Sequence, residues 1–140
     1  MKILDILTEK RKIGNLGEKA AARYLKKHKY KILEYNYVAA GYEIDIIAES
    51  KDRLAFVEVK TRTVSFQNNI EMRPSSSVTP EKQRKIISVA KYYIGAKRTE
   101  KHIGLDVIEV YLENTKSGKK IQRIEHLTDT FSIDTAYNRK

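Results

Sequence analysis

Two stretches that lie close together in the chain decide the expected fold: YEIDIIA at residues 42–48 and LAFVEVKT at residues 54–61. Both are rich in residues that favour β-strands, and a short polar segment separates them, so we expect a hairpin of two strands. Successive side chains of a strand point to opposite faces of the sheet. The second stretch is apolar on both faces until Glu58 and Lys60, which indicates a strand at the centre of the sheet.

The same alternation predicts which side chains of the first strand lie together. One face should carry Tyr42, Ile44, Ile46 and Ala48, and the other should carry Glu43, Asp45 and Ile47. The glutamate and the lysine at the end of the second strand also share a face. If the two faces coincide, two carboxylates and a lysine lie side by side among apolar neighbours.

Carboxylates in such a place repel one another and lose hydration, and a bound divalent cation offsets both penalties. Mg²⁺ suits the set, with Mn²⁺ as its substitute, because it binds one or two carboxylates, keeps several waters and accepts phosphate oxygens. We expect Asp45, Glu58 and the backbone carbonyl of Val59 to hold the metal. Lys60 would orient the attacking water or stabilise the charged transition state of phosphodiester hydrolysis. A solvated ion pair of Lys60 with either carboxylate is the structural alternative.

Apolar residues recur at helical spacing both before and after the hairpin. The first helical pattern spans residues 9–28, and its glycines, Gly14 and Gly17, indicate either a start near Asn15 or close packing at that point. The second pattern follows a Thr-Pro pair, which suits the start of a helix, and spans residues 80–95.

The remaining strands are expected at residues 30–37, 104–112 and 121–127. The order αβββαβ, with the last strand added at its end, predicts an α/β fold in which helices flank a mixed central sheet. The length predicts a single domain over residues 1–140. Within it, residues 63–78 are expected to form a mobile loop and residues 132–140 a frayed tail.

The charge of the chain points to a polyanionic partner. Its 28 lysines and arginines exceed its 18 aspartates and glutamates, for a formal net charge of +10. Basic residues crowd both expected helices, so nucleic acid is the expected partner. The candidate contact residues are Arg62, Lys82, Arg84 and Lys85.

Composition also excludes several classes of protein. The chain has no cysteine, which removes disulfides, thiolate catalysis and metal sites held by cysteine. No apolar stretch has the length of a signal-peptide core or of a membrane span, so we expect a cytoplasmic protein with no membrane partner.

Four segments together resemble the YraN-like family of bacterial proteins: NLGEKAAARYL (15–25), GYEIDIIA (41–48), FVEVKTR (56–62) and SVTPEKQRKIISVAKYYI (77–94). The resemblance covers most of the chain. That family is similar to the PD-(D/E)XK nucleases and the archaeal Holliday junction resolvases. The similarity implies a restriction-endonuclease-like fold and metal-dependent hydrolysis of DNA, at branched or otherwise distorted structures.

The resemblance also assigns residues to the expected site. Asp45, Glu58 and Lys60 match the three active-site positions, Glu18 matches the glutamate of the first helix, and Gln83 matches the polar position that begins the next helix. Glu18 either approaches the metal through a water or is an exposed helical glutamate. Glu43 is a supporting group, an alternative ligand or a partner for the lysine.

The sequence departs from the family pattern at two positions. Tyr42 stands where the family has a glycine, and Val38 stands where it has an arginine. Both border the expected site, so they concern substrate contacts more than metal binding. Two other functions stay open, a binding module that keeps the fold without cleaving and a scaffold that does not bind DNA. The likeness to resolvases implies a homodimer, because a symmetric junction is cut at two sites.

Overall fold

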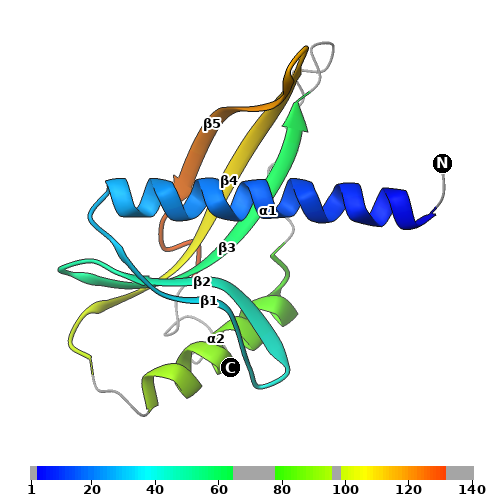
Figure 1. Cartoon of the computed structure of the whole chain (residues 1–140). Helices are drawn as coiled ribbons and strands as arrows, with labels where there is room; N and C mark the ends of the chain where they lie inside the picture. Colours follow the sequence, from blue (N-terminus) through cyan, green and yellow to red (C-terminus); the bar gives the residue numbers. More distant parts are fainter. Residues whose placement is uncertain (1–2, 65–77, 96–98, 132–140) are drawn as a thin grey trace.

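The computed structural model describes residues 3–64, 78–95 and 99–131. Its elements are α1 (Ile3–Lys27), β1 (Lys31–Ala39), β2 (Tyr42–Glu49), β3 (Arg53–Val64), α2 (Pro80–Gly95), β4 (His102–Thr115) and β5 (Gly118–Leu127). The five strands form one sheet in the order β1-β2-β3-β4-β5 (Figure 1). The expected α/β class, the mixed central sheet and the additional last strand are confirmed.

The sheet is mixed because one pair of neighbouring strands is parallel. Neighbouring strands are antiparallel except β3 and β4, which are parallel. A parallel pair requires a crossover connection, and α2 lies within it. The two helices cover opposite faces of the sheet, α1 over one and α2 over the other (Figure 1). None of the helices in the described residues is long and apolar enough to cross a membrane.

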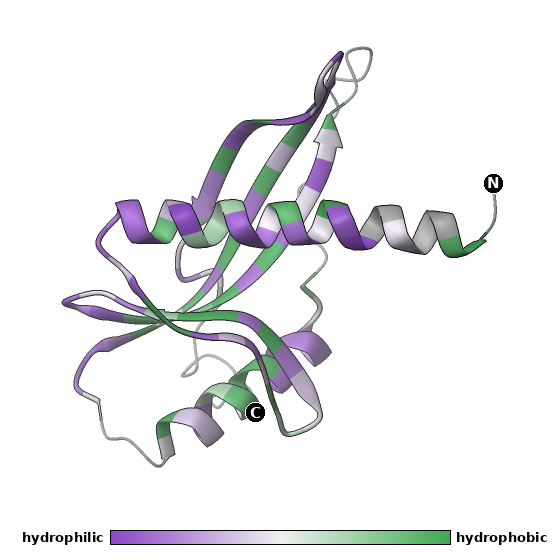
Figure 2. Ribbon diagram, viewed as in Figure 1, coloured by the Kyte–Doolittle hydropathy of each residue, from purple (hydrophilic) through white to green (hydrophobic). Residues whose placement is uncertain are grey.

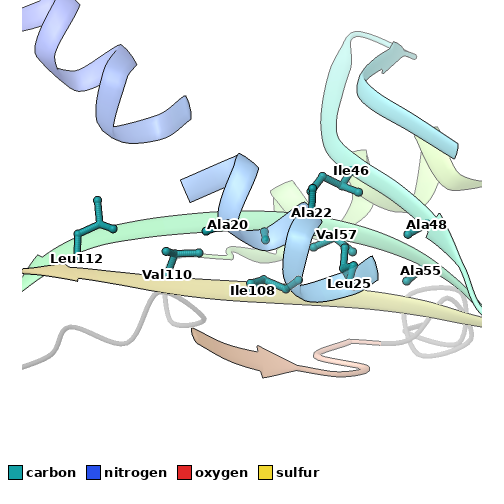
Figure 3. Close-up of a cluster of buried hydrophobic side chains, with 11 residues drawn as sticks. Ala20, Ala22, Leu25, Ile46, Ala48, Ala55, Val57, Ile108, Val110 and Leu112 are labelled. Carbon is teal, nitrogen blue, oxygen red and sulfur yellow. The ribbon is translucent and has the colours of Figure 1, made fainter. Parts of the chain in front are cut away.

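Two apolar clusters separate the sheet from its helices. Beneath α1, Ala21 and Leu25 pack in one cluster with Val57 of β3 and Ile108 of β4, and all four are fully buried. Figure 3 labels the last three among the side chains of this cluster. The cluster beneath α2 is built in the same way from the other face. Figure 2 shows hydrophobic residues recurring along β3 and β4 while hydrophilic residues interrupt α1. β3 is the middle strand of the five, as its apolar sequence predicted.

The alternation expected for β2 is wrong at one place. Ile44 and Ile47 pack in the cluster beneath α2, whereas Ile46 and Ala48 pack in the cluster beneath α1. The strand therefore changes phase at Asp45. The ladder to β3 runs only from the Ile46–Val57 pair to the Glu49–Leu54 pair, so the backbone of the first half of β2 pairs with β1 but not with β3.

Some boundaries also differ from the expected ones. α1 begins at Ile3, well before residue 9 or Asn15, and β3 continues to Val64, into the segment expected to be a loop. The rest of that loop, residues 65–77, and the tail at residues 132–140 lie outside the described residues.

Gly17 marks a close approach of α1 to the sheet. A Cβ atom at this position would lie 1.8 Å from the Thr61 Oγ1 and 3.0 Å from the Thr61 Cβ, whereas a Cβ atom at Gly14 would meet nothing within 4 Å. Of the two explanations for these glycines, close packing therefore holds for Gly17. The absence of a side chain lets α1 lie directly over the part of β3 that continues past β2.

A buried ionic network ties the start of β3 to β4 and β5. Arg53 donates two hydrogen bonds to Asp106, of 2.8 Å and 2.9 Å, and a third of 2.8 Å to the Tyr30 hydroxyl. His126 of β5 lies 2.8 Å from the same carboxylate. The Asp129 N–H also donates to it. Burial alone would raise the pKa of Asp106, but these hydrogen bonds lower it to about 2.

We expect Gly17→Ala to lower the free energy of unfolding by about 1–3 kcal/mol, because the new methyl group overpacks against Thr61. Gly14→Ala is the matched control in the same helix and should raise it by up to about 1 kcal/mol through helix propensity. Urea unfolding measures both. Adding Thr61→Ala should restore part of the loss at residue 17, and equal effects of the two glycine changes would contradict the packing.

Asp106→Asn should lower the free energy of unfolding by about 2–4 kcal/mol at pH 7, because it removes the charge that pairs with the largely buried Arg53. The folded-state pKa of Asp106 lies below its unfolded value. Its stabilising contribution is therefore present above about pH 4 and is lost as the pH falls through about 2. Urea titrations of both proteins between pH 2 and pH 7 should converge at the acid end, and a constant difference would argue against this source of stability.

Candidate active site

Asp45 lies where β2 and β3 separate. The ladder between the strands ends at Ile46 and Val57, so the backbone of β3 beyond that pair has no partner on β2. A buried N–H without a partner is costly. The Asp45 Oδ2 accepts a hydrogen bond of 2.8 Å from the Val59 N–H and takes the place of the missing strand. The carboxylate is thereby held against β3.

Glu58 lies next to this point on β3 and is half-buried. The Tyr42 hydroxyl donates a 3.3 Å hydrogen bond to the Glu58 Oε2. Burial, and then the charge of Glu58, raises the pKa of Tyr42 to about 12, so Tyr42 keeps its proton as a donor at neutral pH. Sequence reasoning did not assign Tyr42 to the site. Its replacement of the family's glycine was the signal that could have found it.

The acidic side chains of the site shift one another's pKa values. Burial raises the pKa of Asp45 to about 7; the Val59 N–H opposes the shift, and the charges of Glu58, Glu18 and Glu43 add to it. Burial also raises the pKa of Glu18, and the charge of Glu43 raises it further. The structure therefore brings Asp45 and Glu58 together with both supporting glutamates, from α1 and from β2.

Two lysines offset part of this negative charge. Burial raises the pKa of Glu58, while Lys60 and then Lys82 lower it. Lys60 is half-buried, two residues after Glu58 on β3. Lys82 belongs to the first turn of α2, in the crossover connection between β3 and β4. The acidic pair Asp45 and Glu58 is thus flanked by one lysine from β3 and another from α2.

Lys60 has a further acidic neighbour that sequence reasoning missed. It pairs in register with Glu109 of β4, which is completely buried. One oxygen of Glu109 accepts a hydrogen bond from the Tyr111 hydroxyl, and the other has no partner among the described residues. A glutamate in the middle of the apolar run GLDVIEVYL was the sequence signal for this position.

The remaining predicted residues lie around this centre in different ways. The Gln83 side chain donates a 3.2 Å hydrogen bond to the Val78 carbonyl, so it supports the start of α2. Arg84 and Lys85 are exposed on α2, and Lys85 lies 3.8 Å from Glu81. Arg62 follows Lys60 on β3, and its Nε atom is buried without a partner within the described segments.

The donor set fits a hard cation that retains water. Among the described residues, no three histidine, aspartate or glutamate side chains gather closely enough to hold a metal by themselves. The donors at the separation of β2 and β3 are instead two carboxylates, Asp45 and Glu58, beside the backbone of Val59. Mg²⁺ accepts such a partial set because it keeps several of its waters. Burial is the largest cause of the raised pKa of both acids, so a bound cation would offset their loss of hydration.

The architecture defines the class of fold. A mixed five-stranded sheet between two helices, in the order αβββαββ, is consistent with a nuclease-like fold. The chain also matches the uncharacterised protein family UPF0102 over residues 17–110.

Individual relatives agree over nearly their whole length. A UPF0102 protein of Caldanaerobacter subterraneus subsp. tengcongensis is 41% identical over 124 residues, which cover 87% of this chain and 96% of the relative. One of Syntrophus aciditrophicus is 37% identical over 134 residues, which cover 95% and 97%. One of Clostridioides difficile is 43% identical over 120 residues, which cover 84% and 95%. The chain belongs to the UPF0102 family, the YraN-like family that its sequence resembles.

The raised pKa of Asp45 has a consequence for stability that can be measured. Between its ordinary value of 3.8 and about 7, the folded chain binds more protons at Asp45 than the unfolded chain, so this residue lowers the free energy of unfolding as the pH rises. Asp45→Asn keeps an oxygen for the Val59 N–H and should raise the free energy of unfolding by about 1–3 kcal/mol at pH 8.

The same substitution should bring no gain at pH 4, where the native carboxyl is protonated in the folded state. Urea unfolding at pH 4, 6 and 8 measures the difference. Asp52→Asn is the control, because Asp52 is exposed in the turn between β2 and β3. A gain for Asp45→Asn that is the same at all three pH values would contradict an origin in the buried charge.

Proposed function

We propose that this protein is a metal-dependent phosphodiesterase that hydrolyses DNA, at branched or otherwise distorted structures. The single observation that carries the proposal is the placement of Asp45 and Glu58, largely withdrawn from water where β2 leaves β3, with Lys60 on the same strand. Two carboxylates in such a place destabilise the fold. A cation and a phosphodiester are the ligands that would make use of them.

Mg²⁺ or Mn²⁺ held by Asp45, Glu58 and the Val59 carbonyl would supply Lewis-acid chemistry and neutralise charge on the phosphate. The residues of the chain then have separate tasks. The Val59 N–H fixes the orientation of Asp45, and the Tyr42 hydroxyl fixes that of Glu58. In the reaction, water forms a bond to phosphorus, the bond from phosphorus to one ester oxygen breaks, and that oxygen leaves with a proton as an alcohol. Lys60 would stabilise the negative charge that develops.

The charge of the molecule supports a nucleic-acid substrate. A formal net charge of +10 attracts polyanions. Lys82, which acts on Glu58, and Arg84 both belong to the first turns of α2, beside the site. Arg62 and Lys85 are further candidates for phosphate contacts. The proposal includes action in the cytoplasm, and for a junction cut at two symmetric sites it includes a homodimer.

The main alternative is a nucleic-acid-binding module without catalysis, and the basic surface favours it as much as the nuclease. The paired acids discriminate between the two. A binding module has no use for carboxylates that repel the phosphate backbone, whereas a metal site requires them.

Calorimetry with Mg²⁺ and Mn²⁺, followed by cleavage of a labelled four-way DNA junction with the same samples, tests the proposal. Asp45→Asn and Glu58→Gln should lose metal binding and lower cleavage by at least about a hundredfold, the upper end of the effect of residues that only support a metal ligand. Lys60→Met should keep metal binding and lose cleavage. Asp52→Asn should change neither.

The possible results separate the functions. Metal binding that depends on Asp45 and Glu58, without cleavage of linear or branched DNA, would support the metal site and rule out the nuclease activity. No metal binding by the native protein, alone or with DNA, would overturn the proposal and favour the binding module. In that case, DNA binding that weakens as the salt concentration rises would support the binding module.

A further inference from the structure

A hollow of about 500 Å³ lies between α1 and β1. Its lining includes Lys19, Arg23 and Lys26 from α1, and Tyr35 and Asn36 from β1. Ligand sites in proteins occupy about 300–1,000 Å³, so the hollow has the size of a binding site for a nucleotide.

The helical wall of the hollow is strongly basic. Lys19, Arg23 and Lys26 follow one another at spacings of four and three residues, so they form one stripe on α1. All three are exposed. Within the described parts of the chain, none of them forms an ion pair with a carboxylate. Their charge is therefore available to an anionic ligand, and phosphate is the anion that nucleic acids present.

The opposite wall carries an exposed aromatic side chain. Tyr35 is 52% exposed and belongs to neither of the two apolar clusters. Its ring contacts no other aromatic ring in the described residues. Core packing, which explains a buried tyrosine, does not account for this one. An aromatic face beside cations is the combination with which proteins bind single-stranded nucleic acids, because bases stack on the ring while phosphates meet the cations.

Glu18 belongs both to the lining of the hollow and to the acidic residues around Asp45. This residue lines the hollow, and its charge is one of those that raise the pKa of Asp45. A strand whose scissile phosphate lies at Asp45 and Glu58 can therefore place a neighbouring nucleotide in the hollow.

We propose that this hollow binds one unpaired nucleotide of the substrate, with its base stacked on Tyr35 and a flanking phosphate held by Lys19, Arg23 and Lys26. The inference rests on the proposed function and narrows its substrate class. A base inside a duplex is stacked on both sides by its neighbours and cannot also stack on a protein side chain. The substrate is therefore a nucleic acid with a single-stranded stretch beside the cleavage position. The stacking and phosphate contacts are shared by DNA and RNA.

The absence of tryptophan from the chain allows a direct test. Tyr35→Trp introduces a single tryptophan at the hollow, and stacking of a base on it quenches its fluorescence. The titrations use dT₁₂, U₁₂ and a blunt DNA duplex in EDTA, so they require neither a metal nor cleavage. Tyr92→Trp is the matched control, because Tyr92 is 67% exposed on α2, which covers the other face of the sheet.

We expect quenching of the Tyr35→Trp variant by single strands and little by the duplex, with no such difference for Tyr92→Trp. Comparison of dT₁₂ with U₁₂ identifies which nucleic acid binds more tightly. Quenching without cleavage of either the four-way junction or a branched DNA with a single-stranded arm would support this site and rule out the nuclease. Cleavage of duplex junctions without quenching would keep the nuclease and overturn this site. Equal quenching by single strand and duplex would also overturn it.

Affinity measurements with the otherwise native chain provide a second readout. Tyr35→Ala should weaken binding of dT₁₂ by about tenfold, within the range for one stacked base, and leave duplex binding unchanged. Lys26→Ala should lower the salt dependence of single-strand binding by about 0.7 in the logarithmic slope. Lys116→Ala, an exposed lysine in the turn between β4 and β5, should not. Thermal melts of each variant confirm that it is folded, and unchanged affinity in folded Tyr35→Ala would refute the stacking.

Discussion

The hydrogen bond from the Val59 N–H to the Asp45 carboxylate links the course of the backbone to the chemistry of the site. Where β2 turns away from β3, an amide of β3 loses its partner, and the side chain of Asp45 replaces it. The same separation uncovers the edge of β3, and Gly17 lets α1 approach β3 there. The position of the acids thus follows from the end of one ladder, and the close approach of α1 follows from the absence of a side chain at Gly17.

Two groups of polar residues beside β3 contain buried acids whose pKa values shift in opposite directions. At the start of β3, Asp106 of β4 receives hydrogen bonds from Arg53 and its neighbours, and its pKa falls. Beyond the separation from β2, Asp45 has one backbone donor and three acidic neighbours, and its pKa rises to about 7. The first arrangement stabilises the fold without any ligand. The second leaves charge to be neutralised by something that binds, which is the physical ground for treating it as a functional site.

The sequence predicted the parts of this structure that depend on local pattern. The hairpin of YEIDIIA and LAFVEVKT, the central place of β3 and the sharing of a region by Asp45, Glu58 and Lys60 all follow from alternation and from a short connection. The phase change at Asp45 could not be predicted, because it depends on where the ladder ends and alternation assumes that it continues. The contribution of Lys82 could not be predicted either, since it depends on how the crossover returns α2 to the sheet. The position of Tyr35 in the hollow could not be predicted either. An exposed tyrosine on an edge strand has no distinctive sequence pattern, and it becomes notable only because α1 lies opposite.

The parallel pairing of β3 with β4 has a consequence for the order of folding. Arg53 and Asp106 are 53 residues apart in the chain, so their pairing requires closure of a long loop. Asp45 and Val59 are only 14 residues apart, and a hairpin alone brings them together. Contacts between distant parts of the chain form slowly. The acidic pair is therefore encoded in the part of the chain that can assemble early. The complete five-stranded sheet, and with it the contributions of Lys82 and Glu109, requires the slow, long-range step. A partly folded molecule would already contain both acids but would lack the surroundings that make them a site.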